Sequence, residues 1–158
     1  MNEVISPFSL SLRWLVATLH LLTLPLGLAA IWARSRALSR ARSAADLPSV
    51  FAADNLWGLA AFLWLATGLV RLLAGLDKPT GYYLHAHVFY AKMGLFLIVF
   101  LLELRPMTTL IRWRGALRRG AAVDTAAAPA LATISQIQVV LVVAIVFAAT
   151  ALARGFFF

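Results

Sequence analysis

Four long apolar segments, separated by shorter polar stretches, dominate the chain. They run from about residue 12 to 32, 50 to 73, 82 to 104 and 130 to 153. Each has the roughly 20 residues that a helix needs to cross the hydrocarbon core of a bilayer. The alternation of apolar and polar residues typical of a membrane β-barrel is absent, and helices satisfy their own backbone hydrogen bonds in lipid. The pattern therefore predicts an all-α bundle of four transmembrane helices, forming a single domain over residues 1–158.

Composition supports a membrane protein and excludes several kinds of site. Of the 158 residues, 63% are apolar and 13% are charged, and the mean hydropathy is +0.89. A soluble domain is about half apolar and about a quarter charged. The chain contains no cysteine, which excludes thiol catalysis, cysteine-ligated zinc and iron–sulfur clusters.

Positive charges concentrate in the first and third connections. These connections carry Arg34, Arg36, Arg40 and Arg42, and Arg105, Arg112, Arg114, Arg118 and Arg119. The opposite side carries only Arg13, Arg71, Lys78 and Arg154. The positive-inside rule then places both basic connections in the cytoplasm and both termini outside. Topology and lipid headgroups thus account for the net charge of +8, and no nucleic-acid partner is expected.

Pro106 is expected to kink or end the third span, because proline lacks the amide hydrogen that continues a helix. Beyond it, apolar residues recur at helical spacing among arginines from Met107 to Leu117. This pattern is typical of a short basic helix in the cytoplasmic interface. The small residues from Ala121 to Ala128 are predicted to form a linker before the fourth span.

Ionisable residues inside an apolar segment are costly and are therefore candidates for function. In the third segment, His85, Lys92 and Glu103 fall within about 20° of one another at 100° per residue, which predicts a polar stripe. His87 points roughly the opposite way. Lys92 lies about 15 Å from the outer end of its segment, at the 1.5 Å rise of a helix, and is expected to face the interior.

The first segment carries a second stripe, formed by Arg13, His20, Gly27 and Arg34 at a spacing of seven residues. His20 lies about 12 Å below the outer end of its helix, a depth similar to that of Lys92. The small residues on this face allow another helix, or a flat cofactor, to approach the backbone.

Toward the cytoplasmic side, a hydrogen-bonded cluster of Asp54, Glu103 and Gln136 is expected, with Asn55 and nearby arginines. For several of these residues a purely structural role is the alternative to a role in a site. A single hydrogen bond to a neighbouring helix would satisfy His20, and His85 has the position of an interfacial residue. The tryptophans and tyrosines are interpreted as packing residues and interface anchors.

Histidines on facing helices of a small bundle are a common way to hold haem iron. His20 with His85, or His20 alone, is the candidate ligand set. Arg13, Arg71 and Lys78 are candidates to pair with the haem propionates. Zinc fits less well, because it takes three or four clustered ligands.

Three stretches carry a resemblance to a known family: LRWLVATLHLL, VFAADNLWGLAAFLWLATGLVR and YYLHAHVFYAKMGLFLIVFLLELRPMTTLIRWR. They resemble a family of bacterial four-helix inner-membrane proteins, domain-of-unknown-function family 2214, over nearly the whole chain. The resemblance implies the bacterial inner membrane as location and implies no activity.

The layout is more distantly similar to the J-type protoporphyrinogen IX oxidases, small four-helix membrane proteins that bind haem b. That resemblance matches His20 to the histidine of their first helix, and His85 or His87 with Lys92 to the histidine and lysine that begin their third. The oxidases place that lysine closer to the histidine than Lys92 lies to His85 or His87. This difference affects the expected substrate chemistry more than the expected haem binding. The copper-resistance D-type membrane proteins share a similar layout.

The leading hypothesis is a haem b protein with a redox or oxidase-like role. His20 is the axial ligand, His85 the second ligand or proton group, and Lys92 a charge partner or proton donor. Alternatives are a small transporter subunit, a metal handler or a membrane scaffold without enzymatic activity. The expected partners are the lipid bilayer, a porphyrin or quinone-like small molecule and further copies of the chain.

Overall fold

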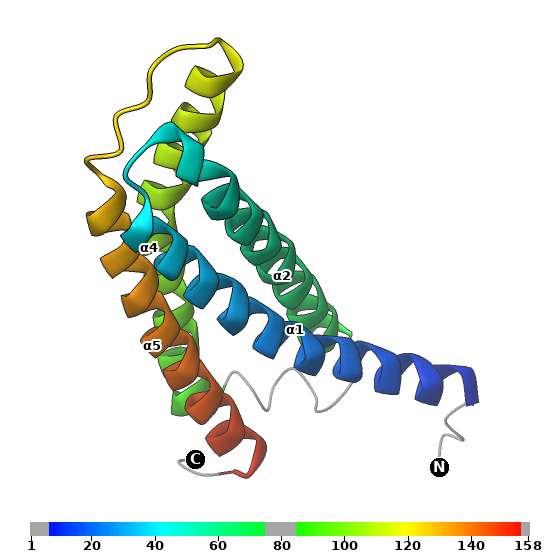
Figure 1. Cartoon of the computed structure of the whole chain (residues 1–158). Coiled ribbons are helices and arrows are strands. Elements are labelled where there is room, and N and C mark those ends of the chain that lie inside the picture. The colour runs from blue at the N-terminus through cyan, green and yellow to red at the C-terminus, as the bar shows by residue number, and fades with distance from the viewer. Residues whose placement is uncertain (1–6, 75–84, 156–158) are drawn as a thin grey trace, which may run out of the picture.

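The computed structural model describes residues 7–74 and 85–155 and consists of long helices (Figure 1). These are α1 (Pro7–Arg40), α2 (Leu47–Leu73), α4 (His87–Arg118) and α5 (Ala128–Ala153), with a turn of 3-10 helix, η1 (Ala44–Asp46), before α2. Four helices are long and apolar enough to cross a membrane, and the described residues contain no strand. The prediction of an all-α bundle with four transmembrane helices is confirmed.

The helices form a wedge. α1 packs against α2 and α5, and α4 packs against α5. Figure 1 shows that α2 and α4 come together where α2 begins and α4 ends, and separate toward the opposite end of the bundle. We call the first the closed end, bounded by Arg40, Leu47, Arg118 and Ala128, and the second the open end, bounded by Leu73, His87 and Ala153.

Two of the helices are longer than the apolar segments suggest. α1 has 34 residues and α4 has 32. At 1.5 Å per residue these helices are roughly 50 Å long, against a hydrocarbon core of about 30 Å. Their ends therefore tilt within the bilayer or extend beyond its hydrocarbon.

Of the two predicted effects of Pro106, a kink or an end of the third span, the end is wrong, and so is a separate interfacial helix beyond it. α4 runs without a break through Pro106 to Arg118. Proline removes one backbone hydrogen bond from a helix, a loss that packing against neighbouring helices can offset. Pro106 itself is buried, as are Thr109, Leu110 and Trp113 in the next two turns.

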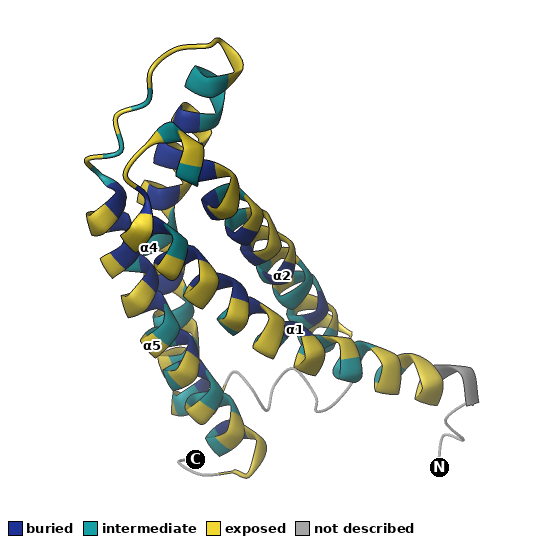
Figure 2. Ribbon diagram, in the orientation of Figure 1, coloured by how far each residue is buried: buried dark blue, intermediate teal, exposed yellow. Residues whose placement is uncertain are grey.

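The core lies along the helix contacts, and the outer faces stay apolar (Figure 2). One buried cluster fills the closed end and includes Leu38, Leu47, Val50, Leu110, Trp113 and Leu131. A second lies at mid-length and includes Ile31, Trp57, Val99, Val142 and Ile145. Large side chains such as Phe62, Leu73 and Phe147 are exposed. An apolar exterior of this kind suits contact with lipid.

Gly27 lies in a close contact between α1 and α2. A Cβ atom at this position would lie 3.3 Å from Cζ3 of Trp57 and 3.6 Å from Cβ of Ala60. The prediction that small residues of the first segment admit a neighbouring helix is confirmed, and that helix is α2. Trp57 is buried in this contact and is not an interface anchor.

Candidate functional site

A buried ion-pair network joins all four long helices in the half of the bundle nearer the closed end. At its centre, the side chain of Arg34 in α1 is fully buried. Its Nη1 donates to Oδ1 of Asp54 in α2 at 2.8 Å and to Oε1 of Glu103 in α4 at 2.6 Å. Its Nη2 donates to Oε2 of Glu103 and to Oε1 of Gln138 in α5, both at 2.8 Å, and Nε donates to Oγ of Ser135 at 3.2 Å.

The network is balanced in charge. The second oxygen of Asp54 accepts a hydrogen bond from Nη2 of Arg114 at 2.8 Å, so two arginines face two carboxylates. The amide of Gln138 donates to Oε2 of Glu103 at 2.7 Å and to the carbonyl of Val99 at 3.2 Å. Burying charges in an apolar bundle is tolerated when each is paired and hydrogen-bonded, as here.

The predicted cluster around Asp54 and Glu103 is thus confirmed in part. The glutamine is Gln138 and not Gln136, which is exposed, and Asn55 is exposed as well. Arg34 lies inside α1 and not in a connection. The spacing of Ser135 and Gln138 could have identified them as partners in the network, because residues three apart share a helix face. Both side chains take part in its hydrogen bonds.

A cavity of about 500 Å³ lies toward the open end, between the diverging helix pairs. Its lining comes from all four long helices and is mostly apolar, with three aromatic side chains, Trp64, Phe89 and Phe96. Three residues of the predicted site also line it: His20, Arg71 and Lys92.

His20 is held by Thr67 of α2. Nδ1 of His20 and Oγ1 of Thr67 lie 2.8 Å apart. The Thr67 hydroxyl donates to the carbonyl of Leu63 at 2.6 Å, so we assign Thr67 as acceptor and Nδ1 of His20 as the protonated ring nitrogen. In this tautomer Nε2 carries the lone pair that can bind a metal.

Trp64 and Gly68 lie close to the imidazole of His20. Trp64 stacks on His20 with a centroid distance of 5.9 Å and an interplanar angle of 30°. A Cβ atom at Gly68 would lie 3.3 Å from Cε1 of His20. A side chain at this position would therefore require the ring to shift by a few tenths of an ångström.

The charged residues of the cavity are cations. Arg71 and Lys92 both line it, and no aspartate or glutamate is among the described residues of its wall. Arg71 is two residues from the end of α2, and Lys92 is five residues into α4, about 7.5 Å from its start. The two cations therefore border the cavity on the side of the open end. The wall thus combines apolar side chains with two positively charged ones.

Two other predicted site residues lie elsewhere. His85 is exposed and does not line the cavity. Ala86 has φ −90° and ψ 115°, so the helical register does not continue from His85 into α4, and the predicted stripe begins at Lys92. Arg13 is half-buried in α1 and also lies away from the cavity wall. Lys78 is outside the described residues. In the described part of the chain, no three side chains of His, Asp or Glu converge as a metal-binding group.

Comparison with known proteins gives one match. The family described as "Predicted membrane protein (DUF2214)" matches residues 12–156. No curated protein and no solved structure matches the chain. The two more distant resemblances therefore stay predictions.

Proposed function

The chain belongs to this family of membrane proteins, and from that premise we propose that it binds haem b in the cavity at the open end and has a redox role in the membrane. The proposal rests mainly on the position and hydrogen bonding of His20. Its Nδ1 is fixed by Thr67, inside an aromatic cavity bordered by two cations.

The residues present fit a haem group. A metal-ligating histidine almost always donates its other ring N–H to a second side chain or carbonyl, as His20 does to Thr67. Aromatic and aliphatic walls suit a flat apolar macrocycle, and Gly68 leaves room beside the imidazole. Arg71 and Lys92 are placed to stabilise carboxylates such as the propionates. When bound, haem supplies one-electron exchange at its iron.

In this proposal the protein contributes His20 as its only histidine ligand. His85, the predicted second ligand or proton group, does not reach the cavity wall. Lys92 acts as a charge partner at the border of the cavity. Trp64 and Phe96, in edge contact at 6.3 Å, help to exclude water from the imidazole.

The visible spectrum of the purified protein, as isolated and after haem addition, tests the proposal. We expect a Soret band that His20→Ala removes or shifts strongly. His87→Ala is the matched control, because His87 is exposed at the start of α4 and does not line the cavity. The absence of a Soret band after reconstitution, or an equal effect of both substitutions, would rule out haem binding through His20.

The ion-pair network favours a second candidate, a membrane scaffold or small transporter subunit without enzymatic activity. Its charged atoms bind one another across α1, α2 and α4, neutral side chains of α5 add hydrogen bonds, and none of its residues lines the cavity. Lys92→Met separates the two candidates. A role at the cavity predicts a changed haem spectrum, whereas a scaffold predicts an unchanged spectrum and cellular phenotype. Elemental analysis of the protein distinguishes either from a metal handler.

A further inference from the structure

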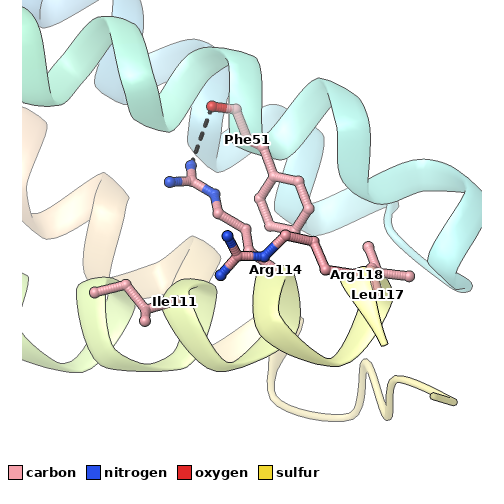
Figure 3. Close-up of a pocket in the computed structure, with 5 residues that line it drawn as sticks. All are labelled: Phe51, Ile111, Arg114, Leu117 and Arg118. Carbon is pink, nitrogen blue, oxygen red and sulfur yellow. Dashed lines mark hydrogen bonds between the residues drawn. The ribbon is translucent and has the colours of Figure 1, made fainter. Parts of the chain in front are cut away.

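We propose that a groove between the start of α2 and the end of α4 is a binding site for one anionic phospholipid (Figure 3). The groove has a volume of about 410 Å³ and is lined by Phe51, Ile111, Arg114, Leu117 and Arg118. Arg114 and Arg118 bind the lipid phosphate, and the three apolar residues contact the adjoining acyl chain. The site lies at the closed end, away from the haem cavity, and does not depend on it.

The proposal places the groove at the depth of lipid headgroups. A hydrocarbon core of about 30 Å corresponds to roughly 20 helical residues, so a span that enters at His87 leaves the hydrocarbon near Met107. The groove residues of α4 begin one turn later, at Ile111. Figure 1 shows the last turns of α4 extending past the first turn of α5. An apolar wall next to arginines at this depth matches the junction of a phosphate and its acyl chains.

Arg114 is fixed in place before any ligand binds. Its Nη2 donates to Oδ2 of Asp54 at 2.8 Å and to the carbonyl of Phe51 at 3.3 Å. Its guanidinium carbon lies 4.8 Å from the centroid of the Phe51 ring. A guanidinium held in one orientation loses little entropy on binding, and its remaining N–H groups suit the oxygens of a phosphate.

Arg118 supplies the second positive charge. It is exposed, one helical turn beyond Arg114, and no carboxylate among the described residues forms an ion pair with it. In Figure 3 both guanidinium groups lie in the space between α2 and α4. Two adjacent arginines, one of them held in place, favour a headgroup with a net negative charge over a zwitterionic one.

The apolar part of the groove selects a lipid over a small soluble anion. Ile111 is 57% exposed, although it sits among arginines at the end of a membrane helix. Phe51 and Leu117 are half-buried beside it. Inorganic phosphate would leave this apolar surface in water, whereas the first methylenes of an acyl chain would cover it.

Native mass spectrometry tests the proposal, with protein released from micelles that contain equal amounts of phosphatidylglycerol and phosphatidylcholine. We expect the wild-type protein to retain one phosphatidylglycerol in preference to phosphatidylcholine. Arg118→Gln should lower that preference about fivefold, since a basic residue near an anionic surface contributes roughly 1 kcal/mol.

Arg112→Gln is the matched control. Arg112 is an exposed arginine of the same helix and undergoes the same charge change, but it does not line the groove. The control should retain the wild-type preference, and glycerol phosphate without acyl chains should not displace the lipid. Equal losses in both variants would show diffuse attraction to the basic end and would overturn the proposal. Displacement by glycerol phosphate, or no preference in the wild-type protein, would overturn it as well.

Discussion

Arg34 of α1 binds side chains of the other three long helices, forming ion pairs with α2 and α4 and hydrogen bonds with α5. Replacing it by methionine, of similar length, leaves Asp54 and Glu103 without their shared partner in an apolar surrounding. Loss of one member of a buried ion pair typically costs about 3–5 kcal/mol. We expect Arg34→Met to lower the free energy of unfolding by about that amount, measured by SDS titration in mixed micelles with helicity as readout.

The control for this prediction is Arg36→Met. Arg36 lies two residues away in α1 and is exposed, so its removal should change the unfolding free energy by less than about 1 kcal/mol. Arg34→Lys should not restore stability, because an ammonium group cannot reproduce the five-donor fork. A small loss in Arg34→Met, equal to that in the control, would contradict the role assigned to the network.

The sequence predicted the carboxylates of this network better than its arginine. Asp54 and Glu103 stood out because they lie in apolar segments. The sequence places Arg34 both on the stripe of the first segment and among the arginines of the following connection, because the apolar run before it ends near Trp32. Its partners are 20, 69 and 104 residues away, and only the tertiary fold brings them together.

Gly68 controls the position of the His20 imidazole. Gly68→Ala places a Cβ atom 3.3 Å from Cε1 of His20, so the ring has to shift. Overpacking of this kind costs about 1–3 kcal/mol, and we expect haem to bind about tenfold more weakly in a titration followed at the Soret band.

Gly58→Ala is the control for Gly68→Ala. It makes the same substitution in α2 at a position where a Cβ atom meets nothing within 4 Å. Haem affinity in this variant should equal that of the wild-type protein. Equal affinity in both variants would show that the contact between Gly68 and His20 does not position the ligand.

At the scale of elements, the contact between α1 and α2 depends on the absence of a side chain at Gly27. Gly27→Leu inserts a branched side chain where Trp57 and Ala60 already lie 3.3 and 3.6 Å from a Cβ position. We expect it to lower the free energy of unfolding by about 1–3 kcal/mol, the usual cost of overpacking. Gly58→Leu, on an exposed face of the same helix pair, should be close to neutral in the same SDS titration.

The number and type of the helices follow from hydropathy, but their ends do not. The length of an apolar segment indicates how much of a helix crosses lipid. The backbone hydrogen bonds of the helix can continue beyond that segment into polar sequence. α1 therefore continues through Ser35 and Arg36 to Arg40, and α4 continues past Pro106 to Arg118. Proline ends a helix only when its lost hydrogen bond is not offset by packing, and the burial of Pro106 was not visible in the sequence.

On the scale of the whole molecule, the two ends of the bundle differ. The closed end combines the ion-pair network with a dense core, and the open end holds the cavity. The inward orientation of His20 and Lys92 could be predicted from their positions on their helices. The cavity could not be predicted, because it results from the divergence of α2 and α4. For the same reason, only the three-dimensional structure shows that His85 lies outside the cavity wall and that Gly68 contacts His20.

The orientation of this bundle in the membrane can be measured with single cysteines, since the chain has none of its own. The exposed arginines at the closed end are Arg36, Arg40, Arg42, Arg105, Arg112, Arg118 and Arg119. By the positive-inside rule the closed end should face the cytoplasm. Ala121→Cys, just after α4, should then resist an impermeant maleimide in sealed right-side-out vesicles and react once the vesicles are opened. Ala74→Cys, at the end of α2, should react in both. Both positions are exposed, so a reversed pattern would reflect topology and not burial, and would place the basic end outside.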